Sequence, residues 1–257
     1  MLKVKNLYKS YKTGNVTYDV LKNISFEVKK GEFVAVMGPS GSGKTTLLNS
    51  ISCFIPFEEG EILLGGENIS GLNEEKLADI RNQKLGFVFQ DFMLLDGLSV
   101  IENICLPQII SNKEVVKMEV LANKLCNTFG ISHIRDKYPA EISGGEKQRS
   151  AVARALINNP YVILADEPTG NLDSKSARAV IDSFVQAKCK LEATVFMVTH
   201  DSFAASFCDR VIVLKDGKVY TELTRSGNRI EFMDKLLDTL KKLGGDDSDN
   251  EQDYIKA

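Results

Sequence analysis

Long apolar runs are absent from this chain of 257 residues, and no stretch approaches the roughly 20 apolar residues of a membrane-spanning helix. Residues 1–7 alternate apolar and polar side chains as a strand does, and they lack the apolar core of a secretory signal. These absences exclude a protein that crosses a bilayer by itself, and they predict that the chain stays in the cytoplasm.

Cysteine pairs and an excess of positive charge are lacking as well. The five cysteines are odd in number and include no Cys-x-x-Cys pair, so we expect reduced structural thiols and neither disulfides nor a zinc site. The formal net charge of −3 argues against a nucleic-acid binder that relies on a broad basic face. We therefore expect no nucleic-acid partner.

Strand-like and helix-like segments alternate along most of the chain, which predicts an α/β fold with a mostly parallel sheet covered on both faces. The expected strands occupy residues 3–7, 24–28, 32–37, 162–165, 194–198, 210–214 and 218–223. The expected helices include residues 44–52 and 174–190 and an amphipathic stretch around 233–243. Turn residues predict hairpins at 24–37, 60–69 and 210–223.

The chain is expected to form one domain, residues 1–243, with a helical subdomain inserted at about residues 91–158. Within that insertion, apolar residues recur at the spacing of one helix face, namely Met118, Leu121, Ala122, Leu125 and Phe129. Residues 244–257 are acidic, poor in apolar side chains and begin with two glycines, so we expect a flexible tail with no function.

A glycine-rich loop separates the strand 32–37 from the helix 44–52. It reads Gly38-Pro39-Ser40-Gly41-Ser42-Gly43-Lys44-Thr45 and is followed by Thr46. Glycines let successive backbone N–H groups point inward, which makes a nest for phosphate oxygens at the start of a helix. Lys44 is expected to contact the β- and γ-phosphates, Thr45 to bind Mg²⁺ and Thr46 to reach an α-phosphate oxygen.

Two adjacent carboxylates follow the buried strand 162–165. Asp166 and Glu167 lie at its carboxyl end, where ligands bind in parallel α/β sheets. Neighbouring strand residues point to opposite faces, so the two carboxylates share one site only if the chain bends, and Pro168-Thr169-Gly170 can supply that bend. Asp166 then suits the metal shell and Glu167 suits the attacking water.

A second glycine-containing helix start reads Ser143-Gly144-Gly145-Glu146. One interpretation is structural, because Ser143 and Glu146 have the spacing of a capping box. The other is functional, because a helix start without side chains at Gly144 and Gly145 is also a good anion site. Since the chain already has a complete phosphate loop, this second site would receive the nucleotide of another copy, and both interpretations can hold together.

Taken together, these motifs resemble an ATP-binding-cassette ATPase, the cytosolic motor subunit of an ABC transporter, over nearly all of residues 1–240. The resemblance implies a P-loop NTPase fold with a RecA-like sheet, a β-rich N-terminal lip and an inserted helical subdomain. It implies that Gln90 contacts Mg²⁺ and the water, that His200 holds the γ-phosphate, and that Asp173 lies in a loop that crosses a dimer interface.

Some positions are less clearly assigned by the resemblance. Tyr11 matches the aromatic residue that stacks on adenine in this family, but Tyr8 and Tyr18 are close in sequence. Glu146 stands where many members have glutamine, a departure that leaves the Ser143 and Gly145 contacts expected. His133 lies in a polar loop, where an ordinary surface histidine is expected.

Longer stretches narrow the resemblance. Residues 166–174 are similar to the macrolide-exporter-like group, and residues 89–96, 200–207 and 236–245 are similar to its bacitracin-type antimicrobial-peptide resistance branch. This branch implies a permease with a large extracellular domain, often allied to a sensor kinase, which would hold the chain at the inner face of the membrane. The apolar residues Phe92, Leu94, Leu95 and Leu98 either grip that permease or belong to the core of the helical block.

The expected mechanism is ATP-driven closure of a homodimer, with two nucleotides held between the phosphate loop of one copy and residues 143–145 of the other. Glu167, His200, Gln90 and Lys44 are the expected catalytic residues. The alternative is a cell-division or lipoprotein-release ATPase, whose core motifs would look nearly the same. A DNA-repair or chromosome-organising ATPase is disfavoured, because only about 100 residues without sustained heptads separate the two glycine motifs.

Overall fold

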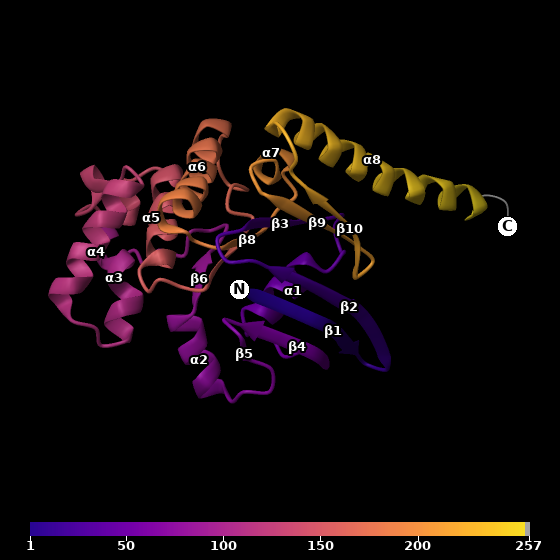
Figure 1. The fold of residues 1–257 in the computed structure, drawn as a ribbon, viewed down its shortest axis with the longest axis horizontal. Coiled ribbons are helices and arrows are strands. Elements are labelled where there is room, and N and C mark those ends of the chain that lie inside the picture. Colours follow the sequence, from indigo (N-terminus) through magenta and orange to yellow (C-terminus); the bar gives the residue numbers. More distant parts are fainter. Residues whose placement is uncertain (255–257) are drawn as a thin grey trace.

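The computed structural model describes residues 1–254, with side chains described as far as residue 243. Two sheets and a set of helices make up the fold (Figure 1). The strands are β1 (Leu2–Thr13), β2 (Val16–Val28), β3 (Phe33–Met37), β4 (Glu59–Leu64), β5 (Glu67–Asn68), β6 (Leu85–Val88), β7 (Val162–Asp166), β8 (Val195–Val198), β9 (Arg210–Lys215) and β10 (Lys218–Thr224). The predicted α/β class is confirmed.

The helices connect these strands or extend from them. They are α1 (Lys44–Ile51), α2 (Glu74–Gln83), α3 (Val100–Ile110), α4 (Val115–Thr128), α5 (Gly144–Leu156), α6 (Ser174–Leu191), α7 (Ser202–Ala205) and α8 (Arg229–Tyr254), with the short 3₁₀ turns η1 (Ser132–Ile134) and η2 (Pro139–Glu141). Among the described residues, we find no helix that combines the length and the apolar composition needed to span a membrane.

The central sheet has the strand order β10-β9-β3-β8-β7-β6, and all its neighbouring strands run parallel except β10 and β9. A second sheet, of order β2-β1-β4-β5, is antiparallel. Alternate residues of β3 face different partners. Phe33, Ala35 and Met37 pack with the helices, whereas Val34 and Val36 pack with α1 and the antiparallel sheet. The central sheet is therefore covered on both faces, as predicted.

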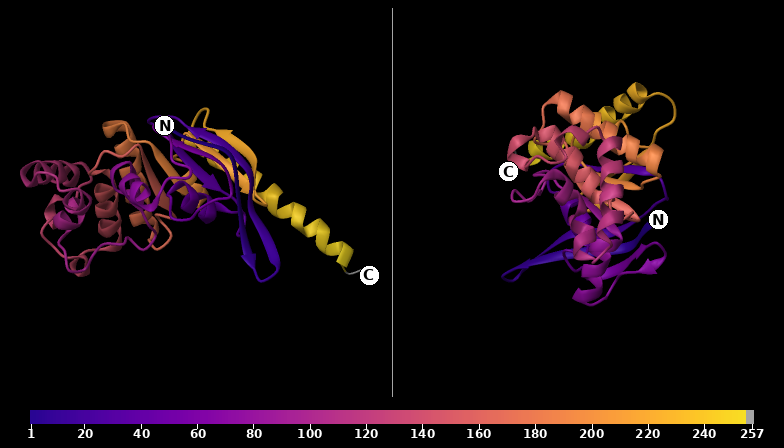
Figure 2. Two further views of the ribbon diagram at one scale, coloured as in Figure 1. Left: turned by 90° about the horizontal axis from the view of Figure 1, so that it is seen from below. Right: turned by 90° about the vertical axis from the view of Figure 1, so that its left-hand side faces the viewer.

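Helices α3, α4 and α5 gather at one side of the molecule, between β6 and β7 in the sequence (Figure 1). Their apolar side chains join the core on the helical face of the central sheet, among them Ile104, Ala122, Leu125 and Val152. In Figure 2 the far end of the β1–β2 hairpin and the C-terminal part of α8 extend beyond the packed body of the chain.

The hairpin predicted at residues 24–37 is wrong. β2 pairs with β1, whereas β3 lies in the centre of the other sheet between β8 and β9. The turn between β2 and β3 carries the chain from one sheet to the other. Its backbone is closed by Glu32, whose N–H donates to the Lys29 carbonyl and whose carboxylate accepts from the Lys29 N–H at 2.8 Å.

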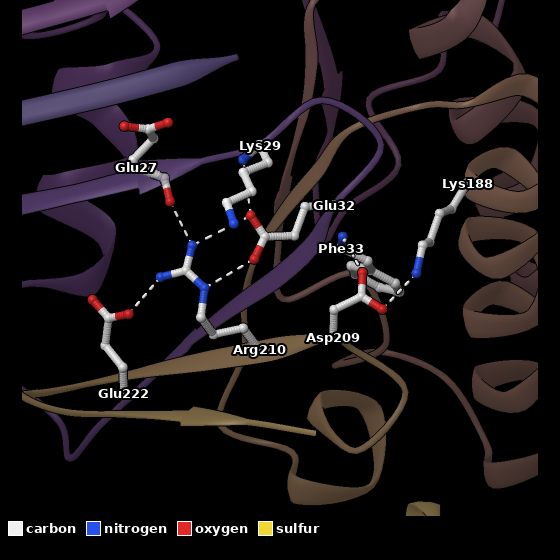
Figure 3. Close-up of polar contacts among 8 residues, drawn as sticks. All are labelled: Glu27, Lys29, Glu32, Phe33, Lys188, Asp209, Arg210 and Glu222. Atoms are coloured by element: carbon white, nitrogen blue, oxygen red, sulfur yellow. Dashed lines mark hydrogen bonds and ion pairs between the residues drawn. The ribbon is translucent and has the colours of Figure 1, made fainter. Parts of the chain in front are cut away.

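Arg210 joins the two sheets at this turn (Figure 3). Its guanidinium donates to the Glu32 carboxylate at 2.9 Å, to Glu222 of β10 at 2.5 Å and to the backbone carbonyl of Glu27 in β2. Next to it, the Asp209 carboxylate accepts from the Phe33 N–H at 2.8 Å and pairs with Lys188 of α6. The two neighbouring residues Asp209 and Arg210 thus connect both sheets and a covering helix.

The chain's C-terminal helix runs further than the sequence indicates. α8 continues through residues 244 and 245, where we predicted that the domain ends, and it reaches Tyr254. A glycine in a helix costs about 1 kcal/mol, which an already formed helix can absorb because each further residue adds a hydrogen bond. The side chains of residues 244–254 and all of residues 255–257 lie outside the described part, so the flexibility of this tail stays a prediction.

Candidate nucleotide site

The residues predicted to bind nucleotide or to catalyse its hydrolysis lie close together because they follow parallel strands. The glycine-rich loop follows β3, Gln90 follows β6, Asp166 ends β7 and His200 follows β8. These four strands run parallel, so their carboxyl ends lie at one edge of the central sheet, where ligands bind in open α/β sheets. The fold therefore gathers at one edge segments that are far apart in the sequence.

The glycine-rich loop, residues 38–45, is tightly packed against strands of both sheets. A methyl group at Gly38 would lie 2.2 Å from the carbonyl oxygen of Leu214 in β9, and one at Gly43 would lie 2.9 Å from that of Val20 in β2. Gly43 also has a φ of 97°, in the left-handed region that favours glycine. These glycines are therefore required by the fold as well as by any phosphate.

Polar groups of the loop differ in exposure and in hydrogen bonding. The Ser42 hydroxyl is buried without a hydrogen-bond partner among the described residues. The Lys44 ammonium donates to the carbonyls of Gly38 and Pro39, both at 2.9 Å, so it folds back over its own loop. Ser40, Gly41 and Thr45 are exposed and Thr46 is half-buried.

Two carboxylates and one ammonium influence each other at the end of β7. Burial lowers the pKa of Lys44, which the negative charges of Glu167 and Asp166 partly offset. Burial also raises the pKa of Asp166, and so does the neighbouring Glu167, while Lys44 acts in the opposite direction. The site thus holds more negative than positive charge, and a bound cation would relieve that imbalance.

Glu167 and His200 face each other. Glu167 has a φ of 43°, which turns the chain as the sequence required, and its N–H donates to the Val198 carbonyl at 2.9 Å. The Glu167 Oε2 atom lies 2.9 Å from Nδ1 of His200 and accepts from the His200 backbone N–H at 3.3 Å. The histidine side chain is 72% exposed and the glutamate 19%, so the pair opens toward solvent.

Gln90 belongs to a chain of amide contacts. Its Nε2 donates to Asn171 Oδ1 at 3.1 Å, and Asn171 Nδ2 donates to the Asp91 carboxylate at 2.8 Å. Asp173, two residues later, caps α6 by accepting from the N–H groups of Lys175 and Ser176, each at 3.0 Å. The capping role of Asp173 was missed from the sequence, where only a role between copies was expected.

The capping box predicted at Ser143 is confirmed. The Ser143 N–H and hydroxyl donate to Glu146 Oε2 at 2.9 and 2.7 Å, and the Glu146 N–H donates back to the hydroxyl at 3.4 Å. Gly145 is buried against Ser176 of α6, whereas Ser143 is exposed at the start of α5. The anion site proposed for this helix start therefore lies open to a second molecule.

Gln148 is a residue whose importance the sequence analysis missed. It is fully buried, and its Nε2 donates to the carbonyl of Phe89 at 3.0 Å and to that of Pro168 at 2.8 Å. It therefore connects α5 to the segments that carry Gln90 and Glu167. Its position within the motif of residues 142–149 was the available signal, because a glutamine buried in a helix needs partners of its own.

Tyr11 lies on β1 directly opposite Tyr18 of β2, so the two rings stand on one face of the hairpin. Both are exposed, and the Lys9 ammonium lies 5.1 Å from the centre of the Tyr11 ring. The assignment of Tyr11 to adenine stacking stays a prediction.

Comparison with known proteins identifies the family. The model of the ABC transporter family matches residues 21–170. The bacitracin export ATP-binding protein BceA of Halalkalibacterium halodurans is 46% identical over 251 residues, which cover 97% of this chain and 99% of that protein. The ABC transporter ATP-binding protein YxdL of Bacillus subtilis is 49% identical over 249 residues, or 97% of this chain and 96% of that protein.

A solved structure agrees with these sequence matches. The ATP-binding cassette MJ0796 from Methanocaldococcus jannaschii, in a dimeric post-hydrolysis state bound to ADP and Pi, superposes with a TM-score of 0.79 at 40% identity. The match covers 89% of this chain and 100% of that chain. With a P-loop at the edge of a parallel sheet and the family model covering more than half its length, the chain belongs to the ABC transporter family, as an ATP-binding subunit that hydrolyses ATP.

Proposed function

We propose that this subunit powers a bacterial permease that confers resistance to bacitracin-type antimicrobial peptides. The observation that carries the proposal is its 46% identity to the bacitracin export protein BceA over nearly the whole of both chains. The permease is expected to carry a large extracellular domain, to hold this chain at the inner face of the cell membrane, and to work with a sensor kinase. Cell-division or lipoprotein-release permeases are the alternative.

The motor cycle that we propose is closure of a homodimer around two ATP molecules. In each copy residues 38–46 cradle the phosphates, and Ser143 to Gly145 of the other copy contact the γ-phosphate. The exposure of Ser143 and the dimeric state of the cassette MJ0796 support this arrangement. Lys44 and His200 would stabilise the charge that develops on the γ-phosphate, and Glu167 would take the proton of the attacking water.

Mg²⁺ fits the donors at this site. The ion prefers oxygen ligands and is commonly held by one or two carboxylates together with nucleotide phosphates. Asp166, Thr45 and Gln90 would hold it, and in the described residues no group of three or more His, Cys, Asp or Glu side chains could bind a metal ion unaided. When bound, the ion supplies positive charge to the phosphates, next to the carboxylates of Asp166 and Glu167.

The permease would dock on an apolar groove between α2, α3 and β6. Its volume is about 390 Å³, and its apolar lining includes Phe54, Phe87, Phe89, Met93, Leu106 and Ile110. None of the four residues that the sequence indicated lines the groove, namely Phe92, Leu94, Leu95 and Leu98, whereas their neighbour Met93, which was not predicted, does. The groove includes Phe89, the neighbour of Gln90. A docked permease element would therefore lie close to Gln90, which we propose contacts Mg²⁺ and the attacking water.

The closed homodimer with ATP held between its two copies, which we call the ATP sandwich, is tested with Glu167→Gln. We expect this variant to bind ATP, to turn over about 100-fold or more slowly because it has lost the general base, and to accumulate as a dimer. Phosphate release and light scattering would measure these effects. Glu192→Gln is the matched control, because Glu192 also has a positive φ, 52°, but lies at the end of α6. An unaltered turnover rate in Glu167→Gln would remove Glu167 from the mechanism.

The permease class is tested by purification from the native bacterium. The tagged chain is isolated from membranes solubilised with Mg-ATP, and co-purifying proteins are identified by mass spectrometry. A permease with a large extracellular domain, accompanied by a sensor kinase, is the expected result. A small division-associated permease would favour the alternative, and recovery of soluble partners alone would overturn the proposal.

A further inference from the structure

His133, which the sequence treated as an ordinary surface residue, contacts the start of α5. Its Nε2 lies 3.0 Å from Glu146 Oε1. The other carboxylate oxygen of Glu146, Oε2, accepts from the N–H and the hydroxyl of Ser143. Glu146 therefore joins His133 to Ser143, and each of its oxygens has a different partner.

The carboxylate creates a difficulty for the proposed sandwich. Ser143 is expected to donate a hydrogen bond to the γ-phosphate of the other copy's ATP, but in this structure its hydroxyl donates to Glu146 Oε2, with 2.7 Å between the two oxygens. Glu146 also brings a negative charge to a site that must receive a phosphate. Hydrogen bonds from Ser143 and the contact with His133 outweigh burial and lower the pKa of Glu146, so this charge is present at neutral pH.

We propose that His133 is a positioning residue for the ATP sandwich. Its imidazole holds Glu146 Oε1 on the side away from Ser143, and its protonated form cancels the carboxylate charge that would repel the γ-phosphate of the second copy's nucleotide. This inference rests on the proposed sandwich. It predicts that ATP-driven dimer formation is coupled to the charge of the His133–Glu146 pair.

Other charged side chains belong to the elements around the His133–Glu146 pair. Lys147 and Arg149 lie on α5, and Lys175 lies on α6. Arg135, which follows η1, pairs with Glu119 of α4 and with Asp136. Asp173 remains negative, because hydrogen bonds within the first turn of α6 lower its pKa. Histidine is the side chain whose charge ordinarily changes in this range.

The test measures the ATP concentration at half-maximal dimer formation, by light scattering of the full chain carrying Glu167→Gln. Between about pH 6 and about pH 8 we expect this concentration to rise about two- to five-fold, as befits a partly exposed ion pair. His133→Gln should hold the high-pH value at both pH values. Glu146→Gln should hold the low-pH value, because glutamine keeps the capping box and removes the charge.

The double variant separates coupling from a general structural effect. Once Glu146→Gln is present, adding His133→Gln should change nothing. Asp136→Asn is the control, because Asp136 lies near His133 in sequence and pairs with Arg135; it should keep the full pH dependence. His200 is present in every variant, so any pH dependence that remains in His133→Gln is subtracted before the variants are compared.

The possible results distinguish the inference from the function beneath it. Equal effects of His133→Gln with and without Glu146→Gln would overturn the positioning role while leaving the sandwich intact. Failure of the Glu167→Gln parent to dimerise with ATP would overturn the sandwich, and with it this inference. Thermal unfolding of each variant checks that the fold is retained.

Discussion

At the scale of single residues, the backbone conformation of Glu167 determines where its carboxylate lies. Glu167 is held at a φ of 43°, which for a residue with a side chain costs about 1–3 kcal/mol. The hydrogen bond from its N–H to the Val198 carbonyl helps to hold this conformation, which brings the carboxylate to His200. The strain therefore serves the juxtaposition of the proposed base with the proposed phosphate ligand.

Gly43 provides a residue-scale test of the phosphate loop. Gly43→Ala would force a methyl group to within 2.8 Å of a Leu21 side-chain carbon and 2.9 Å of the Val20 carbonyl oxygen. Gly130→Ala is the matched control, because Gly130 also has a positive φ, 66°, but its added methyl group would meet nothing within 4 Å. Relative to Gly130→Ala, we expect Gly43→Ala to lower the unfolding free energy by a further amount of about 1–3 kcal/mol.

Urea unfolding of both glycine variants measures this difference. ATP binding should be weakened in Gly43→Ala only, because its loop must shift. Equal losses of stability in the two variants would mean that the loop relaxes freely and that the close packing around Gly43 has little energetic importance.

At the scale of elements, α5 connects the segments of the site. Gln148 bonds the carbonyls that follow β6 and β7, so a shift of this helix is transmitted to the segments of Gln90 and Glu167. The same helix carries Ser143 at its exposed start. Contact with a second copy at one end of α5 is thus linked by two hydrogen bonds to the catalytic segments of this copy.

Gln148→Leu tests this link. The substitution keeps the size of the side chain but leaves the Pro168 carbonyl without its partner, while the Phe89 carbonyl keeps only the Phe92 N–H. We therefore expect the unfolding free energy to fall by about 1–3 kcal/mol and ATP turnover to decrease. Gln108→Leu is the control, since Gln108 of α3 likewise donates to a backbone carbonyl, that of Ile157 at 2.7 Å. Chemical denaturation and phosphate release measure both variants. Equal turnover in the two would contradict a special role for Gln148.

The sequence predicted the elements around the phosphate loop better than the connection between sheets. α1, β7 and α6 lie within a residue of their predicted bounds, because glycines precede α1, an apolar run marks β7 and apolar residues at helical spacing mark α6. The hairpin at residues 24–37 was wrong because a short turn was given more weight than the continuous apolar run of residues 33–37. Such a run indicates a strand buried on both faces of a parallel sheet.

Site residues were predicted where a motif carried them, and missed where only packing reveals them. The Ser143 capping box follows from local spacing, and the bend after Asp166 follows from the turn residues Pro168, Thr169 and Gly170. The bonds of Gln148 and the pairing of His133 with Glu146 join segments that approach only in the folded chain. The helix α2 was missed because a single one of its residues, Ile80, is buried, which leaves a weak apolar pattern.

At the scale of the whole molecule, Arg210 determines how the two sheets sit together. Burial alone would lower its pKa, but hydrogen bonds and ion pairs with Glu32 and Glu222 raise the pKa above its ordinary value. The guanidinium also bonds the Glu27 carbonyl, so one planar group contacts β2, β10 and the turn between β2 and β3. A lysine has no such fork of donors.

Arg210→Ala should therefore lower the unfolding free energy by about 3–5 kcal/mol, because it leaves partly buried carboxylates without their partner. Arg210→Lys should recover only part of this loss. Arg178→Ala is the comparison, since the Arg178–Asp182 pair is exposed at both members and should contribute about 0–1 kcal/mol. Thermal and urea unfolding measure all three, and similar losses for Arg210→Ala and Arg178→Ala would contradict the role of Arg210 between the sheets.

The phosphate loop packs against Val20 of the antiparallel sheet and Leu214 of the central sheet, so its shape depends on both. Nucleotide affinity and the melting temperature of the whole domain are consequently linked quantities. A ligand at about 100 times its dissociation constant adds about 2.7 kcal/mol to the unfolding free energy, and both sheets should share this gain. Calorimetry with increasing ATP should show a single transition moving upward, with no early melting of the N-terminal strands.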